Sequence, residues 1–178
     1  MTHWKVLDER TLLERKWLTI TEQHVELPRD VKMEFHLVSS PDWTSVLALT
    51  AERQVVIVEQ YRHALGGVSR ELPAGVIDPG ESPLQAAQRE LKEETGYSAT
   101  DWRVLQVVRT EPVRHTNSAH FFFAADARRT QEPTPMEDET IQVRLLDVGE
   151  LLRWVDDGRI VHGVHVGAIL LAARRGWI

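Results

Sequence analysis

Cysteine is absent from the 178-residue sequence. A chain without thiols has no disulfide, no cysteine nucleophile and no Cys-ligated zinc site, so these structural and catalytic classes are excluded together. The sequence also lacks an apolar run long enough to cross a bilayer, and its first five residues do not lead into a signal-peptide core. We therefore expect a cytoplasmic protein with no membrane partner.

Basic residues are outnumbered. The chain has 21 Lys and Arg against 27 Asp and Glu, which gives a formal net charge of -6 at pH 7. Such a balance argues against a nucleic-acid-binding surface, although a small phosphorylated substrate carried with its metal remains compatible with it. The hydrophobic fraction of 42% and charged fraction of 27% are ordinary for a soluble globular protein.

The order of strand-like and helix-like segments predicts the fold class. Residues 1–40 have the pattern of a small antiparallel sheet, and residues 41–178 that of a main domain. We expect strands at 17–20, 25–27, 33–38, 45–49, 54–60, 104–108, 119–124 and 141–146, and helices at 148–154 and 163–174. A mixed sheet with helices on both faces, an α/β (α+β) arrangement, is the simplest packing of the main domain.

One segment, GVIDPGESPLQAAQRELKEETGY at 75–97, carries most of the functional information. A Pro-Gly pair at 79–80 is typical of a type II turn, and Ser82 with a Gln three residues later predicts a capping box. The helix should begin at Pro83 and end at Gly96, which adopts the left-handed conformation without strain. Leu84, Ala87 and Leu91 are spaced to form its apolar face.

Three carboxylates share one side of this predicted helix. Glu93 and Glu94 are three and four residues after Glu90, so the three side chains lie within one turn and their charges repel one another. A bound cation would offset this repulsion, and all-oxygen ligation favours Mg2+ or Mn2+ over zinc. The alternative is a solvated acidic helix face, but such a face does not require Gly75, Glu81 and Arg89 at these spacings.

The spacing G-x5-E-x7-R-E-U-x-E-E-x-G-U, where U is a bulky apolar residue, resembles the Nudix box. The chain matches it from Gly75 to Gly96, and only the last position departs, being Tyr97. The segment therefore resembles the Nudix hydrolases, which cleave nucleoside diphosphates linked to another moiety. This resemblance implies an α/β/α sandwich.

The preceding residues narrow the resemblance. Gln60-Tyr61-Arg62, followed by ELPAG at 71–75, is similar to the signature of ADP-ribose and nucleotide-sugar pyrophosphatases. That subfamily implies Mg2+-dependent hydrolysis of the pyrophosphate linkage of ADP-ribose or a related nucleoside diphosphate sugar. It also implies a homodimer to which the N-terminal sheet contributes.

Roles for individual residues follow from this resemblance and from their chemistry. Arg62 and Arg70 offer planar donor forks to phosphate oxygens, and Glu71 would bind substrate or orient one of the arginines. By resemblance, the carbonyl of Ala74 is a metal ligand. Arg89 would pair with Glu81 or a neighbouring carboxylate and hold it in place.

Two loop carboxylates complete the expected site. Similar enzymes carry a catalytic or metal-binding Glu on a loop just before a strand, where this chain has Glu137 and Glu139. Glu137 would be the general base and Glu139 a metal ligand, with the two assignments interchangeable. The resemblance thus gives a catalytic set and a ligand set for two or three ions. The catalytic set is Glu137, Glu93, Glu94 and Arg89, and the ligands are Ala74, Glu90, Glu93, Glu94 and Glu139.

Two other function classes remain open at this stage. One is a Nudix-fold sensor that binds ADP-ribose without turnover, which would not need its box glutamates. The other is a Nudix enzyme that acts on dinucleoside polyphosphates, oxidised nucleotides or capped RNA. The acidic net charge and the QYR and ELPAG stretches disfavour the second class.

Overall fold

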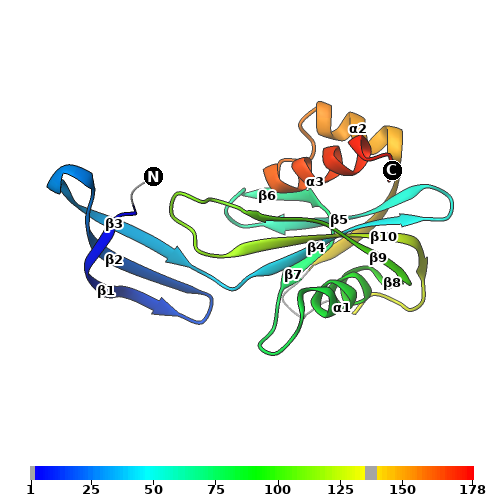
Figure 1. The fold of residues 1–178 in the computed structure, drawn as a ribbon. Helices are drawn as coiled ribbons and strands as arrows, with labels where there is room; N and C mark the ends of the chain where they lie inside the picture. The colour runs from blue at the N-terminus through cyan, green and yellow to red at the C-terminus, as the bar shows by residue number, and fades with distance from the viewer. Residues whose placement is uncertain (1–2, 135–139) are drawn as a thin grey trace. The chain divides into compact units, whose positions relative to one another are not determined.

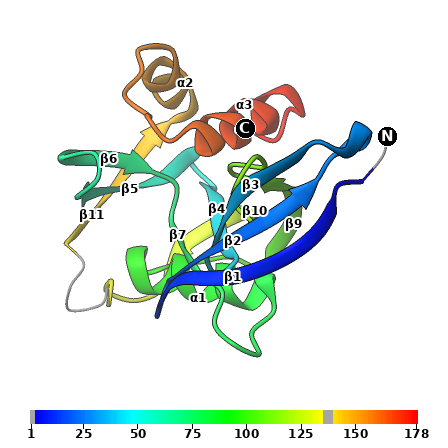
Figure 2. The ribbon, with the colours of Figure 1, turned by 90° about the vertical axis from the view of Figure 1, so that its left-hand side faces the viewer.

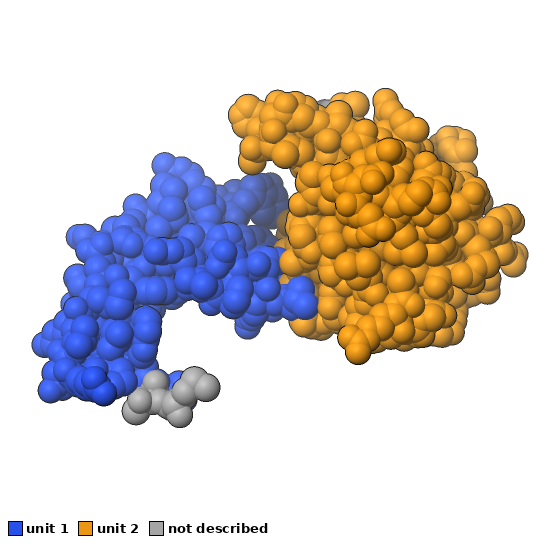
Figure 3. Space-filling view, turned by 90° about the horizontal axis from the view of Figure 1, so that it is seen from above, with its two compact units in different colours: residues 1–42, 108–118 blue, residues 43–107, 119–178 orange. Residues whose placement is uncertain are grey.

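The computed structural model describes residues 3–134 and 140–178, which form two compact units. Unit 1 comprises residues 1–42 and 108–118, and unit 2 comprises residues 43–107 and 119–178 (Figure 3). In sequence order the strands and helices are β1 (Lys5–Arg15), β2 (Leu18–Glu26), the 3-10 turn η1 (Pro28–Asp30), β3 (Lys32–Ser39), β4 (Trp43–Thr50), β5 (Gln54–Arg62), β6 (Gly67–Glu71), β7 (Ala74–Val76), α1 (Pro83–Thr95), β8 (Tyr97–Ser98), β9 (Asp101–Arg109), β10 (Ser118–Arg129), β11 (Ile141–Asp147), α2 (Val148–Asp156) and α3 (Gly163–Arg174).

Unit 1 is built on a three-stranded antiparallel sheet in the order β1-β2-β3 (Figure 1). The connection between β9 and β10 joins this unit through backbone hydrogen bonds on both sides of Val38. The Val38 amide donates to the Arg114 carbonyl oxygen at 2.9 Å, and the Thr116 amide donates to the Val38 carbonyl oxygen at 3.1 Å. The predicted boundary at residue 40 did not include this second segment, and the division into domains stays a prediction.

Unit 2 is a mixed sheet covered by helices. Its central order is β11-β5-β4-β10-β8, with β6 paired to β5, β7 to β4 and β9 to β10. Strands β4 and β10 run parallel, whereas β5 is antiparallel to β4, β6 and β11. Helix α1 covers one face, and α2 and α3 cover the other (Figures 1 and 2). The predicted α/β/α sandwich is confirmed.

Helix α1 has the boundaries that its sequence predicts. The Ser82 side chain accepts from the Gln85 amide while the Gln85 side chain accepts from the Ser82 amide, and Gly96 ends the helix at φ 75°. The preceding turn is closed by a hydrogen bond of 3.0 Å from the Glu81 amide to the Asp78 carbonyl oxygen.

The apolar face of α1 differs from the prediction at one position. Leu84 lies in the first turn and is 37% exposed, whereas Ala86 is fully buried beside Ala87 and Leu91. Ala87 and Leu91 pack on the strands in one cluster, made by Val46, Ala48, Val56, Ala87, Leu91, Phe122, Ala124 and Ala127. Glu94 is also buried on this helix, at 3% exposure, so the sheet-facing side of α1 carries a carboxylate. Among the described residues, no helix has the length and apolar character needed to cross a bilayer.

Candidate active site

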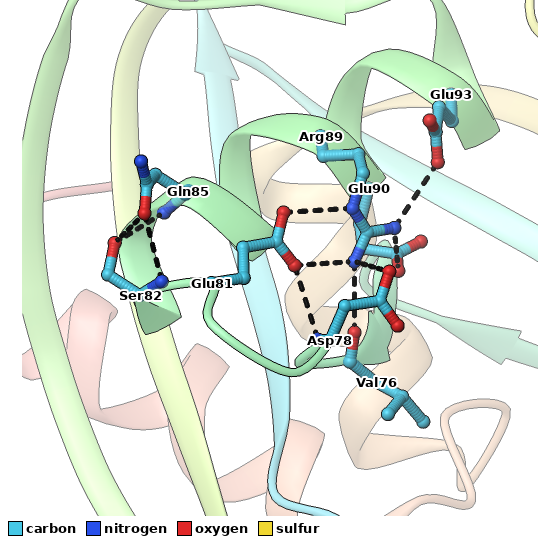
Figure 4. Close-up of polar contacts among 8 residues, drawn as sticks. All are labelled: Val76, Asp78, Glu81, Ser82, Gln85, Arg89, Glu90 and Glu93. Carbon is cyan, nitrogen blue, oxygen red and sulfur yellow. Dashed lines mark hydrogen bonds and ion pairs between the residues drawn. The ribbon is translucent and has the colours of Figure 1, made fainter.

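Arg89 is the centre of a polar network that joins α1 to the turn before it and to β7 (Figure 4). Its Nε and Nη2 atoms donate to the two carboxylate oxygens of Glu81 at 3.0 and 2.9 Å, and Nη2 also donates to the Val76 carbonyl oxygen at 3.0 Å. The Nη1 atom donates to Glu90 at 2.6 Å and to Glu93 at 3.3 Å. The predicted pairing of Arg89 with Glu81 is confirmed, and it ties the turn, β7 and α1 together.

The charges in this network stabilise one another. Hydrogen bonds from Arg89 hold the pKa of Glu81 below its usual value, despite some loss of solvation. The same contact with Glu81, followed by the contact with Glu90, raises the pKa of Arg89 above its ordinary value. Each group is therefore more firmly charged with its partner present than alone.

Glu90 lies against the backbone at Gly75. A Cβ atom at position 75 would stand 2.1 Å from both Cδ and Oε1 of Glu90, closer than any real contact. Gly75 is in β7, opposite Thr44 of β4, so the sheet fixes where this carboxylate meets the backbone. The absence of a side chain at 75 is what lets Glu90 approach.

Glu94 is held from the same strand. Its Oε2 atom accepts a hydrogen bond of 3.0 Å from the amide of Ala74, and its side chain is buried. The ELPAG segment and α1 are thus joined at two successive residues, by Glu94 at Ala74 and by Glu90 at Gly75. These contacts bring together three of the predicted metal ligands, namely the Ala74 backbone, Glu90 and Glu94.

Arg62 and Glu71 form a bidentate ion pair between β5 and β6. The Nε and Nη2 atoms of Arg62 donate to the two oxygens of Glu71 at 3.0 and 2.6 Å. Burial opposes ionisation of Glu71, but hydrogen bonds from Arg62 and Ser69 outweigh it and lower the pKa of Glu71. Glu71, three residues before Ala74, thus holds the guanidinium of Arg62, which is one of the two roles predicted for it.

Arg70 takes a different direction. Successive residues of a strand point to opposite faces, and Arg70 leaves β6 on the face opposite to Glu71. Its Nε atom donates to buried Glu59 at 2.9 Å, and its guanidinium lies 5.3 Å from the ring centroid of Trp154 in α2. Glu59 also accepts from Arg144 at 2.5 Å. These contacts do not bring Arg70 to the box carboxylates, and its predicted role in substrate binding stays a prediction.

His165 of α3 supports the ELPAG segment from the other side, which sequence reasoning did not foresee. Its Nδ1 atom accepts a hydrogen bond of 3.2 Å from the buried amide of Leu72. Burial lowers the pKa of His165 to about 3, so the ring is neutral. Its Nε2 atom has no hydrogen-bond partner among the described residues. The ring stacks on His162, with centroids 4.2 Å apart. The sequence showed a histidine pair on a helix, but nothing local to α3 indicates a partner 93 residues away.

The two predicted loop acids, Glu137 and Glu139, lie outside the described residues. The assignments of general base and additional metal ligand to this pair stay predictions.

The residues around Ala74 and Gly75 fit a hard divalent cation. Their donors are carboxylate oxygens and a backbone carbonyl, the set that Mg2+ and Mn2+ prefer, and the space over Gly75 admits a carboxylate. Glu90 and Glu93 accept hydrogen bonds from Arg89, and Glu94 accepts one from the Ala74 amide.

Comparison with known proteins agrees with this geometry. The NUDIX domain family model matches residues 41–163. An ADP-ribose pyrophosphatase of Bacillus subtilis (strain 168) is 30% identical over 162 residues, which cover 88% of each chain. A methanol dehydrogenase activator of Bacillus methanolicus is 33% identical over 82% of this chain and 79% of that protein. In three dimensions, a crystal structure of an ADP compounds hydrolase has a TM-score of 0.87 and 20% identity, covering 99% of this chain and 95% of the other.

The protein belongs to the Nudix family. The helix that carries Glu90, Glu93 and Glu94 is the box helix of that family, and the structural similarity extends through the N-terminal sheet.

Proposed function

We propose that this protein hydrolyses the pyrophosphate linkage of ADP-ribose or a related nucleoside diphosphate sugar, with Mg2+ as its cofactor. The products would be a nucleoside monophosphate and a sugar phosphate. The observation that carries the proposal is the convergence of Glu90 and Glu94 on the backbone of residues 74–75. Three residues earlier in the chain, Glu71 forms an ion pair with Arg62. The relative named ADP-ribose pyrophosphatase supports this substrate class.

The proposed metal ligands are the Ala74 carbonyl and the carboxylates of Glu90, Glu93, Glu94 and Glu139, which would hold two or three Mg2+ ions, or Mn2+. Bound there, such ions neutralise charge on the phosphate oxygens and acidify a water molecule. Arg89 acts as a positioning residue, because its hydrogen bonds to Glu81 and Glu90 fix the direction of a ligand carboxylate.

The reaction needs a water molecule in line with one phosphorus atom. As the new P–O bond forms, the bridging P–O bond breaks, and its electron pair leaves with the other phosphate. Glu137 would take the proton from the attacking water, with Glu139 the interchangeable candidate. Carboxylates of α1, Glu93 and Glu94, would orient this water and its ions.

The substrate diphosphate would be bound by Arg62, whose two donors already form a fork on Glu71. The Glu71 carboxylate is buried and fixes the guanidinium plane, so a phosphate meets a preorganised donor set rather than a mobile side chain. Arg70 would contribute to the same substrate only by leaving Glu59.

We also propose that the protein is a cytoplasmic homodimer in which residues 1–40 take part. Apolar side chains on one face of the N-terminal sheet support this proposal. Trp4, Val6 and Met33 are 47%, 50% and 39% exposed, on the face opposite to Glu22 and His24. A dimer mass by light scattering at micromolar concentration is expected, and a monomer mass would contradict it.

A substrate panel tests the proposed activity. ADP-ribose, GDP-mannose, UDP-glucose, a dinucleoside polyphosphate and a capped RNA would each be incubated with the protein and Mg2+. A coupled phosphatase then releases phosphate only from the monoester products. We expect the highest kcat/KM for ADP-ribose or another nucleoside diphosphate sugar, and phosphate release lower by orders of magnitude from the Glu94→Gln variant.

Other results would assign the site differently. Preference for the dinucleoside polyphosphate or the capped RNA would move the protein to another group of Nudix enzymes. A ligand that binds tightly and is recovered intact from the wild type would indicate a sensor. Either result contradicts the proposed function.

A further inference from the structure

The polar face of the N-terminal sheet carries a second group of metal-ligating side chains, separate from the Nudix box. Strands β2 and β3 pair Glu22 with His36 and His24 with Glu34. These positions alternate along each strand, so the four side chains stand on the same face. Two imidazoles and two carboxylates therefore form one square on adjacent strands.

The distances within this square suit a small cation. One ligand atom from each of Glu22, His24 and Glu34 lies within 4.8 Å of the other two. The Nε2 atom of His36 is 3.6 Å from Glu22 Oε2 and 3.5 Å from Glu34 Oε1. Two ligands of a tetrahedral ion with bonds of 2.0–2.1 Å are about 3.4 Å apart, which is close to the two separations measured from His36.

Neighbouring groups on β1 orient two of the ligands. Asp8 Oδ1 is 2.6 Å from His24 Nδ1, and Arg10 Nε donates to Glu22 Oε1 at 2.6 Å. Because His24 Nδ1 and Glu22 Oε1 make these contacts, the atoms left to bind an ion are Nε2 of His24 and Oε2 of Glu22. A carboxylate on the far nitrogen of a ligating histidine is the usual arrangement around bound zinc.

The charges next to the four side chains also suit a divalent ion. Asp8, Glu22 and Glu34 supply three carboxylates, and Arg10 supplies one guanidinium on Glu22. Glu22 is only 5% exposed although it is charged, so its environment is partly desolvated. A divalent ion would offset this local excess of carboxylates.

We propose that Glu22, His24, Glu34 and His36 bind one Zn2+ or a similar transition-metal ion, distinct from the Mg2+ of the box. Two nitrogen and two oxygen ligands select zinc-class ions, whereas Mg2+ prefers oxygen alone. Asp8 is a positioning residue for His24. The ion joins β2 to β3 and stabilises the N-terminal sheet. This proposal does not depend on the pyrophosphatase activity.

Cobalt provides a direct readout in the full-length protein. The chelator-stripped protein, kept in excess Mg2+ to occupy the box, would be titrated with Co2+. Tetrahedral Co2+ absorbs visible light far more strongly than octahedral Co2+. We expect a strong band that saturates at one Co2+ per chain and is removed by one equivalent of Zn2+. Zn2+ should also raise the melting temperature.

Variants locate the site and keep the test decisive. His24→Asn and His36→Asn should each remove the band and the Zn2+-dependent rise in melting temperature, and both positions are exposed enough to fold with Asn. Asp8→Asn should weaken Zn2+ binding about 10- to 100-fold without abolishing the band. Glu90→Gln in the box and His63→Gln in the exposed turn after β5 should leave the band unchanged.

Three results would overturn the proposal. Absence of the band in the wild type would mean that the four side chains form cross-strand ion pairs only. Survival of the band in His24→Asn and His36→Asn would place the ion elsewhere. Loss of the band in Glu90→Gln would assign it to the Nudix box.

Discussion

The carboxylate of Glu90 occupies the space where a side chain at Gly75 would stand, with its Cδ and Oε1 atoms each 2.1 Å from an ideal Cβ at that position. One residue of the ELPAG strand and one residue of the box helix are therefore fitted to each other. The glycine is required here by close approach rather than by a left-handed backbone.

Gly75→Ala should displace Glu90 and lower activity. The new methyl group cannot coexist with the present carboxylate position, so Glu90 must rotate away, and its contact with Arg89 at 2.6 Å changes with it. A misplacement of about 1 Å at a reacting centre can cost about 100-fold in rate, and we expect a kcat loss of that order. Steady-state kinetics at saturating Mg2+ would measure it.

Gly67→Ala is the matched control. Gly67 lies at the start of β6 and a Cβ there would meet nothing within 4 Å. Its kcat should stay within about twofold of the wild type, since surface substitutions without contacts are nearly neutral. Equal activity of both alanine variants would show that the position of Glu90 is unimportant for turnover.

Two substitutions of Glu94 can separate its role in turnover from its role in stability. The side chain is buried and accepts from the Ala74 amide at 3.0 Å. In Glu94→Gln the amide oxygen can still accept this hydrogen bond while a repelling charge disappears. We expect turnover to fall by orders of magnitude and the melting temperature to stay the same or rise.

Glu94→Ala should also lose stability. Truncation leaves the Ala74 amide without its acceptor, which typically costs about 1–3 kcal/mol. Urea unfolding of both variants, compared with turnover, would test the pair. If Glu94→Gln were as active as the wild type, Glu94 would be removed from the catalytic set.

Substitutions of Arg62, which pairs with Glu71, should change both the affinity for substrate and the stability of the protein. Arg62→Lys keeps the charge but cannot donate in parallel to two carboxylate oxygens, and we expect KM to rise more than kcat falls. Arg62→Met removes the charge and leaves buried Glu71 without its ion pair, with the hydrogen bond from Ser69 retained. Its cost should be about 2 kcal/mol, below that of a fully buried pair because the Arg62 side chain is 43% exposed.

The pH dependence of this pair has a defined sign. The folded pKa of Glu71 lies below its ordinary value, so the stabilisation is present above the unfolded pKa and is lost as pH falls through the folded pKa. In Arg62→Met this stabilisation is absent at neutral pH, so the free energy of unfolding should fall less than in the wild type as pH falls through the acid range. An equal fall in the two proteins would contradict the lowered pKa of Glu71.

Much of the fold was predictable because its signals are local. The cap at Ser82, the proline at 83 and the glycine at 96 fix α1 without reference to the rest of the chain. The strands at 54–62, 118–129 and 141–147 carry runs of β-branched and aromatic residues, and their predicted positions are confirmed. Pairing of Arg89 with Glu81 was also predictable, because Glu81 lies in the turn just before the helix that carries Arg89.

The rest depends on contacts between distant segments. Leu84 fits the helical spacing, but the sheet does not bury the first turn of α1. Arg70 and Glu71 are adjacent in sequence, and strand alternation sends them to opposite faces, where Glu59 and Arg62 are their partners. A sequence pattern identifies both as charged, but the register of β5 and β6 decides which partner each one meets.

His165 is expected to make the protein less stable as pH falls from neutral. The folded ring is held neutral because burial lowers its pKa to about 3, while the unfolded ring has an ordinary pKa of about 6.5. Between these values the unfolded chain binds a proton that the folded chain does not, so stability rises with pH.

At pH 5 the protonation of this one residue in the unfolded chain should lower the free energy of unfolding by about 2 kcal/mol, compared with a chain in which it stays neutral. In His165→Asn, where the Asn oxygen can accept from the Leu72 amide, the free energy of unfolding should fall less between pH 7 and pH 5. The difference from the wild type should be about that amount. His63→Gln, in an exposed turn, should retain the wild-type dependence. Urea unfolding of the three proteins at both pH values measures the effect, and identical slopes for wild type and His165→Asn would mean that the buried ring is protonated in the native state.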